Sequence, residues 1–343
     1  MLIEDKEKIS KNPQLSVKVL VYNSDKYLRQ CFDSILSQRV NFEYEVIVGE
    51  DCSTDKSRQI CIEYQQKYPH LFRLVLHEKN LGLIGNYQSV NALHRGKYLI
   101  LLGGDDYFCV DDKFQMQYDY METHSDVGLC FTNVIQCTEE GKELSTPMLE
   151  PEIASICFED QLINSKYIAP NSWMLRRSEF DRLIDMQSWF VDESLATTLD
   201  FLHESKLHFI DKVTTVYRSR ENSLSSFRDI QRRWKYESGI YVMQMYYAKK
   251  YAVSDAVVDK IKFTVFTQSL LLAVDADDKE FVADALAFYE SKGYDMTWYA
   301  ENCREYVKTK RLFEQLYSSR AYRLGKFLLK PLTWLNNKIH GRV

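Results

Sequence analysis

Short apolar runs alternate with amphipathic stretches of helical length through the first third of the chain. The apolar runs are Val17–Tyr22, Tyr44–Val48, Leu71–Leu76 and Tyr98–Leu102. Strands that are buried on both faces of a parallel sheet read as continuous apolar runs, and helices connect them by right-handed crossovers. Residues 16–132 therefore predict a series of βαβ units.

The pattern changes after residue 128. Between residues 128 and 219 strand signals stand among irregular stretches, which favours mixed strand pairing. The expected strands are Val127–Ile135, Ser172–Leu175, Leu207–Ile210 and Thr214–Tyr217. From residue 227 onward the periodicity is helical, as in Gln231–Lys249, Ala256–Ala276 and Asp278–Ser291. We expect an N-terminal extension (1–15), an α/β domain (16–226) and a helical C-terminal region (227–343).

Composition narrows the class of protein. The formal net charge of −5 gives no overall attraction to nucleic acid, and no nucleic acid partner is expected. The eight cysteines form no Cys-x-x-Cys pair, so neither a zinc site nor a disulfide framework is predicted. No apolar run is long enough to span a membrane, and the polar start lacks the features of a secretory signal. These observations together predict a cytoplasmic protein.

Polar clusters follow each of the four predicted parallel strands. They are Tyr22-Asn23, Glu50-Asp51, the loop Asn80-Leu81-Gly82 with Asn86, and Gly103-Gly104-Asp105-Asp106. Each cluster alone is also typical of a turn or helix cap. The carboxyl ends of parallel strands meet at one edge of the sheet, where ligands bind. Together the clusters predict a cleft for a nucleotide, with carboxylates for Mg²⁺ or Mn²⁺.

The same segments resemble a known family. Val17–Asn23, Tyr27–Gln38, Glu45–Ser57, Asn80–Asn86 and Gly96–Phe108 look like the nucleotide-sugar-binding domain of family 2 glycosyltransferases, of bacterial polysaccharide type. The resemblance implies the GT-A fold, a Rossmann-like, mostly parallel sheet flanked by helices. It also implies an inverting, metal-dependent, hexosyltransferase-type enzyme. Such an enzyme moves a sugar from a nucleoside diphosphate donor, often a UDP-sugar, to a glycan or lipid-linked hydroxyl.

The resemblance also assigns roles to residues. Tyr22 and Asp51 match positions that contact the base, and Asp105 matches the second carboxylate of the Asp-x-Asp metal motif. Asp106 follows it near the metal and the donor sugar. The expected donor-binding set is Tyr22, Asn23, Glu50, Asp51, Asn80, Gly82, Asn86, Gly104, Asp105, Asp106 and Arg218, with Asp105 and Asp106 on the metal. Gly103 stands where the family has the first carboxylate, so the contact of that carboxylate either comes from elsewhere, with Glu50 as the candidate, or is absent.

A general base is needed because an alcohol is a poor nucleophile until its proton is removed. The family's base lies at a helix start with the pattern Asp-x-x-Leu, ahead of a strand and a Tyr-Arg pair. Asp192 of the segment Trp189–Leu195 fits this pattern best, and Glu193 is the alternative; the Tyr-Arg pair is Tyr217-Arg218. Acidic residues at this place are also typical of an ordinary helix start.

Two further groups of basic residues are candidates for contacts. Arg176 and Arg218 are candidates for pyrophosphate or acceptor contacts because guanidinium groups pair with phosphate in a bidentate way. The segment Arg320–Val343 has no acidic residue and interleaves basic with large apolar side chains. Such a segment favours peripheral contact with the inner face of an anionic membrane, and helix packing is its alternative.

Two other functions remain open on the sequence. A sugar nucleotidyltransferase uses a similar sheet, but its glycine-rich loop after the first strand is absent from Tyr22–Tyr27. A non-catalytic scaffold with the GT-A fold is the other, with the helical C-terminal region forming a homo-oligomer or a membrane contact. Gly103 and the unusual sequence around Asp192 keep this second reading open.

Overall fold

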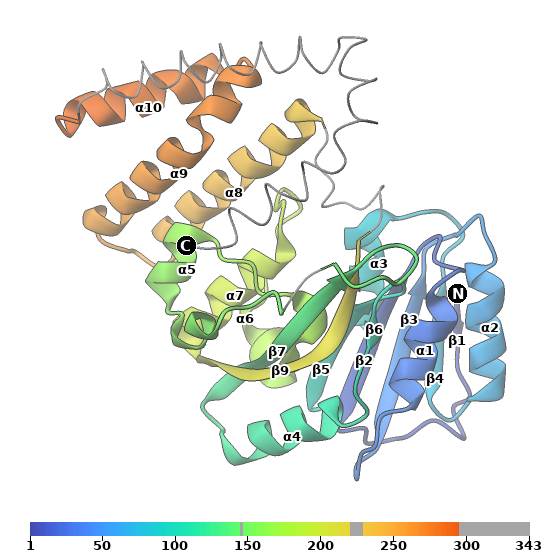
Figure 1. The fold of residues 1–343 in the computed structure, drawn as a ribbon. Coiled ribbons are helices and arrows are strands. Elements are labelled where there is room, and N and C mark those ends of the chain that lie inside the picture. Colours follow the sequence, from blue (N-terminus) through green and yellow to red (C-terminus); the bar gives the residue numbers. More distant parts are fainter. Residues whose placement is uncertain (145–146, 220–228, 295–343) are drawn as a thin grey trace, which may run out of the picture. The chain divides into compact units, whose positions relative to one another are not determined.

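The computed structural model describes residues 1–144, 147–219 and 229–294 (Figure 1). Residues 1–261 form one compact unit, and a second unit begins at Lys262. The boundary expected near residue 227 falls inside the first unit, because the helix that follows packs against earlier helices of that unit. None of the helices in the described ranges has the length and apolar character needed to cross a bilayer.

The described part of the first unit is organised around a mixed sheet. Its strands are β1 (Leu2–Ile3), β2 (Leu15–Val21), β3 (Tyr44–Glu50), β4 (Phe72–Leu76), β5 (Tyr98–Gly103), β6 (Tyr107–Phe108), β7 (Val127–Cys137), β8 (Met174–Arg176) and β9 (Lys206–Arg218), in the spatial order β1-β4-β3-β2-β5-β8-β7-β9-β6. Strands β2 to β5 are parallel, β8 is antiparallel to β5 and β7, and β9 runs parallel to β7. The predicted mostly parallel α/β sheet is thus confirmed.

Helices connect the strands and continue after the sheet. They are α1 (Leu28–Leu36), α2 (Ser57–Lys67), α3 (Gly82–Asn91), α4 (Lys113–Thr123), α5 (Phe158–Asn164), α6 (Arg177–Leu183), α7 (Glu193–Glu204), α8 (Ile230–Lys250), α9 (Asp255–Asp275) and α10 (Lys279–Ser291), with the short 3₁₀ helices η1 (Pro151–Ser155) and η2 (Pro170–Ser172). The expected C-terminal helices are present as α8, α9 and α10. The basic segment Arg320–Val343 lies outside the described residues.

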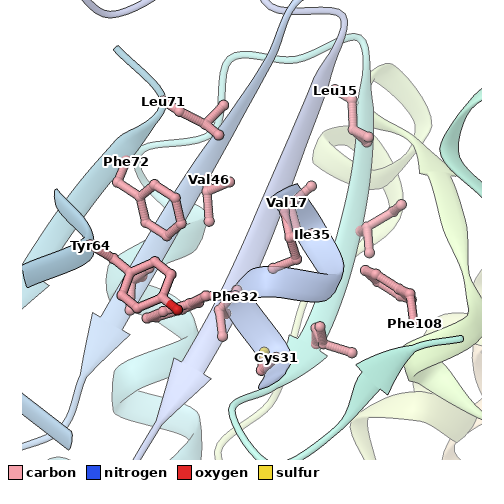
Figure 2. Close-up of a cluster of buried hydrophobic side chains, with 14 of the residues drawn as sticks. Leu15, Val17, Cys31, Phe32, Ile35, Val46, Tyr64, Leu71, Phe72 and Phe108 are labelled. Atoms are coloured by element: carbon pink, nitrogen blue, oxygen red, sulfur yellow. The ribbon is translucent and has the colours of Figure 1, made fainter. Parts of the chain in front are cut away.

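Apolar side chains cover both faces of the sheet. On one face α1, α2 and α4 pack on β2 to β5 through a cluster that includes Phe114 of α4. Figure 2 shows Phe32, Tyr64 and Phe72 of the same cluster. On the other face a second cluster joins α3, α6 and α7 to the sheet. Burial of both faces explains why the strands read as continuous apolar runs.

Two strands expected from the sequence form one continuous strand. The polar residues Asp211 and Lys212 interrupt the apolar pattern, yet β9 runs unbroken from Lys206 to Arg218. Its register with β7 shifts beside Thr132 and Asn133, and the Asn133 side chain donates a hydrogen bond to Asp211. A bulge of this kind places extra polar residues within a strand without ending it.

The parallel strands end in register. Val21 pairs with Glu50, Glu50 pairs with Leu76, and Leu20 pairs with Gly103. The residues that follow these positions therefore emerge at the same edge of the sheet. This edge carries the predicted polar clusters.

Candidate active site

The loop after β3 is fixed by a buried carboxylate. Glu50 is fully buried and accepts a hydrogen bond from the backbone N–H of Ser53 at 2.6 Å. Its other oxygen pairs with Arg58, which also donates to the carbonyl oxygen of His77. Glu50, the candidate to substitute for the missing first metal carboxylate, is engaged in holding the loop that presents Asp51.

Asp51 joins this loop to the start of α3. Its side chain, 2% exposed, accepts a hydrogen bond from the N–H of Leu81 at 2.7 Å. The Asn80 side chain donates to the Asp51 carbonyl oxygen and accepts from the N–H of Gly82. Gly82 has φ +75°, a left-handed conformation that favours glycine at this turn. The loop residues expected in the site therefore lie together beside Asp51.

Asn86 has a different place from the one expected. It is 3% exposed, and its amide donates to the carbonyl oxygen of Gly49 at 2.9 Å. A Cβ at Gly49 would lie 2.1 Å from Asn86 Oδ1, so the helix and strand approach closely here. The Asn86 side chain packs α3 on β3, and its buried amide is not available to a donor in this arrangement.

Tyr22 and Asn23 follow β2 at the same edge of the sheet. Asn23 has φ 48°, and its side chain accepts a hydrogen bond from the N–H of Thr54 at 2.8 Å. Its own N–H donates to Ser53 Oγ. Tyr22, which follows β2, is 46% exposed, so its side chain is accessible to a ligand.

The two adjacent aspartates after β5 lie in different environments. Asp106 is 6% exposed and accepts hydrogen bonds from the Arg218 N–H and the Asn171 amide, both at 2.9 Å. Burial and the neighbouring charge of Asp105 raise the pKa of Asp106 to about 7. Asp105 is only partly buried, and a Cβ at Gly103 would lie 2.7 Å from its Oδ1. The glycine in place of the family's first carboxylate thus leaves room for the Asp105 side chain.

Arg218 is a structural residue of this turn. It is 4% exposed, and its guanidinium donates to the carbonyl oxygens of Asp105 and Glu139 and to Gln30 Oε1. It also lies 4.6 Å from the centre of the Tyr27 ring. Arg218 was expected to bind the donor, but these contacts commit its guanidinium to holding the Asp105 turn.

Arg176 lies away from this edge. It pairs with Tyr98 at the opposite end of β5 from Asp105 and donates to the carbonyl oxygens of Met121 and Val127. Arg176, a candidate for pyrophosphate or acceptor contacts, is thus not brought together with the polar residues after β2 to β5.

Asp192 and Glu193, the acidic pair at the start of α7, differ in their surroundings. Asp192 is the N-cap: its Oδ1 accepts hydrogen bonds from the N–H of Leu195 at 2.9 Å and from Ser194 Oγ at 2.6 Å. Its Oδ2 accepts a hydrogen bond from the hydroxyl of Tyr236 in α8. Burial, together with the charge of Asp192, raises the pKa of Glu193.

Tyr167 links this acidic pair to the aspartate turn. Its pKa is raised by burial and by the nearby charges of Tyr217, Asp106, Asp192 and Glu193. Charges act on one phenol in this way only when they lie within electrostatic range of it. Carboxylates of both the start of α7 and the turn after β5 thus contribute to the raised pKa of Tyr167. No pattern in the sequence singled out Tyr167, which lies between α5 and η2.

A divalent ion would depend on Asp105. Among the described residues no three His, Cys, Asp or Glu side chains converge on one point. Mg²⁺ sites commonly use one or two carboxylates and complete their shell with substrate phosphates and water. One partly exposed carboxylate beside the nucleotide loop fits that kind of site.

Comparison with known proteins agrees with this geometry. Residues 16–184 match the model of Glycosyl transferase family 2, and this part of the chain belongs to that family. An uncharacterized protein of Mycobacterium bovis is 34% identical over 165 residues, which cover 48% of this chain and 47% of that protein. The chain thus spans about half the length of this relative.

Other relatives are less similar in sequence, but a larger share of their own length aligns with this chain. An uncharacterized glycosyltransferase of Methanocaldococcus jannaschii is 26% identical over 78% of this chain and 94% of its own length. Glycosyltransferase GlyG of Streptococcus pneumoniae is 27% identical over 61% of this chain and 72% of its own length.

Solved structures share the fold. TarS 1–349 of S. aureus in complex with UDP-GlcNAc has a TM-score of 0.58 at 17% identity and covers 81% of both chains. The mannosyltransferase PcManGT of Pyrobaculum calidifontis, in complex with GDP-Man and Mn²⁺, has a TM-score of 0.54 at 14% identity and covers 92% of this chain and 83% of its own. The first unit accordingly has the GT-A fold.

Proposed function

We propose that the protein is a metal-dependent inverting glycosyltransferase that moves a sugar from a UDP-sugar to a hydroxyl of a glycan or lipid-linked acceptor. The observation that carries the proposal is that Asp51 and the Asp105-Asp106 turn follow paired parallel strands at one edge of the sheet. The complexes of TarS with UDP and with UDP-GlcNAc support a uridine donor.

The donor half of the site follows from the loops described above. Tyr22 stacks on the base, and Asp51, whose orientation is fixed by Leu81 and Asn80, accepts hydrogen bonds from it. Asp105 holds Mn²⁺ or Mg²⁺, which neutralises the leaving diphosphate when bound. Asp106, through its bonds to Arg218 and Asn171, fixes the turn that carries Asp105.

The contacts of the acidic pair favour Glu193 as the base. Asp192, which the sequence favoured, accepts three hydrogen bonds that cap α7 and join it to α8. A carboxylate with a raised pKa takes a proton more readily near neutral pH. We therefore assign Glu193 to remove the acceptor proton and Asp192 to hold the helix start and to keep the pKa of Glu193 high.

The location of the reaction is a further part of the proposal. We propose that the protein works in the cytoplasm at the inner face of the membrane, held there by the basic segment 320–343. A lipid-linked acceptor would be found at that surface. Self-association through the C-terminal helices is a second arrangement that the sequence allows.

The metal assignment predicts a binding difference. Calorimetry should show that UDP binds more tightly with Mn²⁺ than with a chelator, by about tenfold or more. Asp105→Ala should remove this difference, whereas Asp119→Ala, on the exposed side of α4, should retain it. If Asp105→Ala binds UDP in the presence of Mn²⁺ as tightly as the wild type does, the metal assignment is refuted. If the wild type binds GDP more tightly than UDP, the assignment of a uridine donor is refuted.

The base assignment predicts a loss of turnover without a loss of donor binding. The rate of sugar transfer is measured with a panel of UDP-sugars, and the product is detected by its mass. This rate should fall by roughly 10²- to 10⁴-fold in Glu193→Gln. UDP binding should not change. If Glu193→Gln keeps full turnover, the base is elsewhere, and Asp192→Asn is the next variant. A wild type that binds UDP but neither transfers nor hydrolyses any donor would favour the scaffold function.

A further inference from the structure

We propose that Tyr236 of α8 is a positioning residue: it holds the Asp192 carboxylate in its capping position and thereby fixes where the adjacent Glu193 carboxylate lies. This inference rests on the proposed transferase function. It assigns α8, which follows the family-matched residues 16–184 in the chain, a part in the reaction.

The bonds of Asp192 are the first observation. One oxygen accepts from Leu195 N–H and Ser194 Oγ, both within the first turn of α7. The other oxygen is left for a partner outside the helix, and Tyr236 provides it from 44 residues further along the chain. The side-chain cap of α7 is therefore completed by α8.

Close packing of α8 is a second and independent observation. Gly239 lies in the interior of α8, where glycine is unfavourable compared with alanine. A Cβ at Gly239 would lie 2.5 Å from Cγ1 of Val191, the residue before Asp192. Tyr236 and Gly239 are three residues apart and so share one helix face. That face accommodates the side chain of Val191, the residue that leads into Asp192 and Glu193.

A second attachment lies further along the same two helices. Asp200 of α7, 1% exposed, accepts hydrogen bonds from Lys250 Nζ and Tyr251 OH, both at 2.5 Å. It also accepts one from Tyr247 OH at 3.1 Å. Helices α7 and α8 are thus joined at two carboxylates, of which only Asp192 is next to Glu193.

The ionisable groups around Asp192 and Glu193 determine the pH at which the base takes up a proton. The ionisable groups that face Glu193 and Asp192 are Tyr87 from α3, Tyr167 from the segment before η2, and Tyr236 from α8, with Asp106 beyond Tyr167. Tyr236 donates to Asp192 and so stabilises its negative charge. Without that hydroxyl, the negative charge of the two neighbouring carboxylates is less stabilised, and they take up a proton at a higher pH.

The test compares two tyrosines, Tyr236 of α8 and Tyr251, the C-cap residue of α8, whose hydroxyls donate to Asp192 and Asp200. Tyr236→Phe removes the hydroxyl next to the acidic pair. Tyr251→Phe removes one from Asp200 and is the matched control. The readouts are kcat and KM for the donor across pH, UDP affinity, and thermal stability of the full chain.

Tyr236→Phe should lower kcat by about tenfold near neutral pH and leave donor KM and UDP affinity unchanged. The acidic limb of its kcat profile should move up by about one pH unit. Tyr251→Phe should lose stability without this displacement. Gly239→Ala, which must displace Val191, should lower kcat in the same way and serves as the second variant if Tyr236→Phe does not fold.

An unchanged kcat profile in Tyr236→Phe, or equal displacements in both tyrosine variants, would overturn the inference while leaving the transferase function intact. A uniform loss of kcat at every pH would also overturn it, because a merely structural role predicts that result. Absence of transfer by the wild type would instead refute the proposed function.

Discussion

At the scale of single residues, the buried ionisable side chains hold the site together. Lys113 is fully buried, and its ammonium group donates to the carbonyl oxygen of Ser172 and to Gln117 Oε1, both at 2.7 Å. Ser172 follows Asn171, the residue whose amide bonds to Asp106. Lys113 therefore anchors the 3₁₀ turn that supports the aspartate after β5.

This lysine gives a prediction for stability against pH. Burial lowers the pKa of Lys113 from its ordinary 10.5 to about 7. Between these values the unfolded chain binds a proton that the folded chain has released, so the free energy of unfolding rises with pH. Urea unfolding at pH 7, 8 and 9 should show a slope that Lys113→Met reduces, by up to about 1.4 kcal/mol per pH unit.

The control for Lys113→Met is an exposed lysine. Lys249→Met, on the surface of α8, should leave the slope of the wild type unchanged. Lys18 is also buried, with its pKa lowered to about 7, so the Lys113→Met variant should keep part of the slope. Parallel stability curves for the wild type and Lys113→Met would contradict the assignment.

At the scale of helices and strands, the sequence predicted the edge of the sheet well. The apolar runs gave the four parallel strands, and parallel strands end at one edge, so the polar residues after them had to lie together. The start of α7 at Asp192 was also predicted. These features depend on local periodicity and on neighbours in the sequence.

The uses of individual polar side chains were not predictable in the same way. Glu50, Asn86 and Arg218 were expected to face a donor, and each is instead engaged with the protein. Their partners are chosen by folding, as when Asn171 reaches Asp106 across 65 residues or Tyr236 reaches Asp192 across 44. Periodicity carries no information on such pairs, so a residue's type and place in the sequence do not reveal whether it is free to bind a ligand.

At the scale of the whole molecule, charge is unevenly distributed along the chain. The net charge is −5, so the average surface is repelled by an anionic membrane. The segment 320–343 differs from this average, because it is basic and apolar without any acid. Its basic residues are Arg320, Arg323, Lys326, Lys330, Lys338 and Arg342. A membrane contact would therefore depend on this segment and not on the overall charge.

Sedimentation with vesicles tests that dependence. The full chain should cosediment with phosphatidylglycerol vesicles at low salt and much less with purely zwitterionic ones, because each basic residue near an anionic surface contributes about 1 kcal/mol. Raising the salt to about 0.5 M should release part of the bound protein by screening, while the apolar side chains retain the rest. The double change Lys326→Glu and Lys330→Glu should abolish binding to the vesicles. The control is Lys6→Glu with Lys8→Glu, which makes the same change in net charge at exposed N-terminal positions and should not abolish binding. Equal binding by both double variants would mean that segment 320–343 does not attach the protein to the membrane, and the acceptor would then have to reach the cleft from solution.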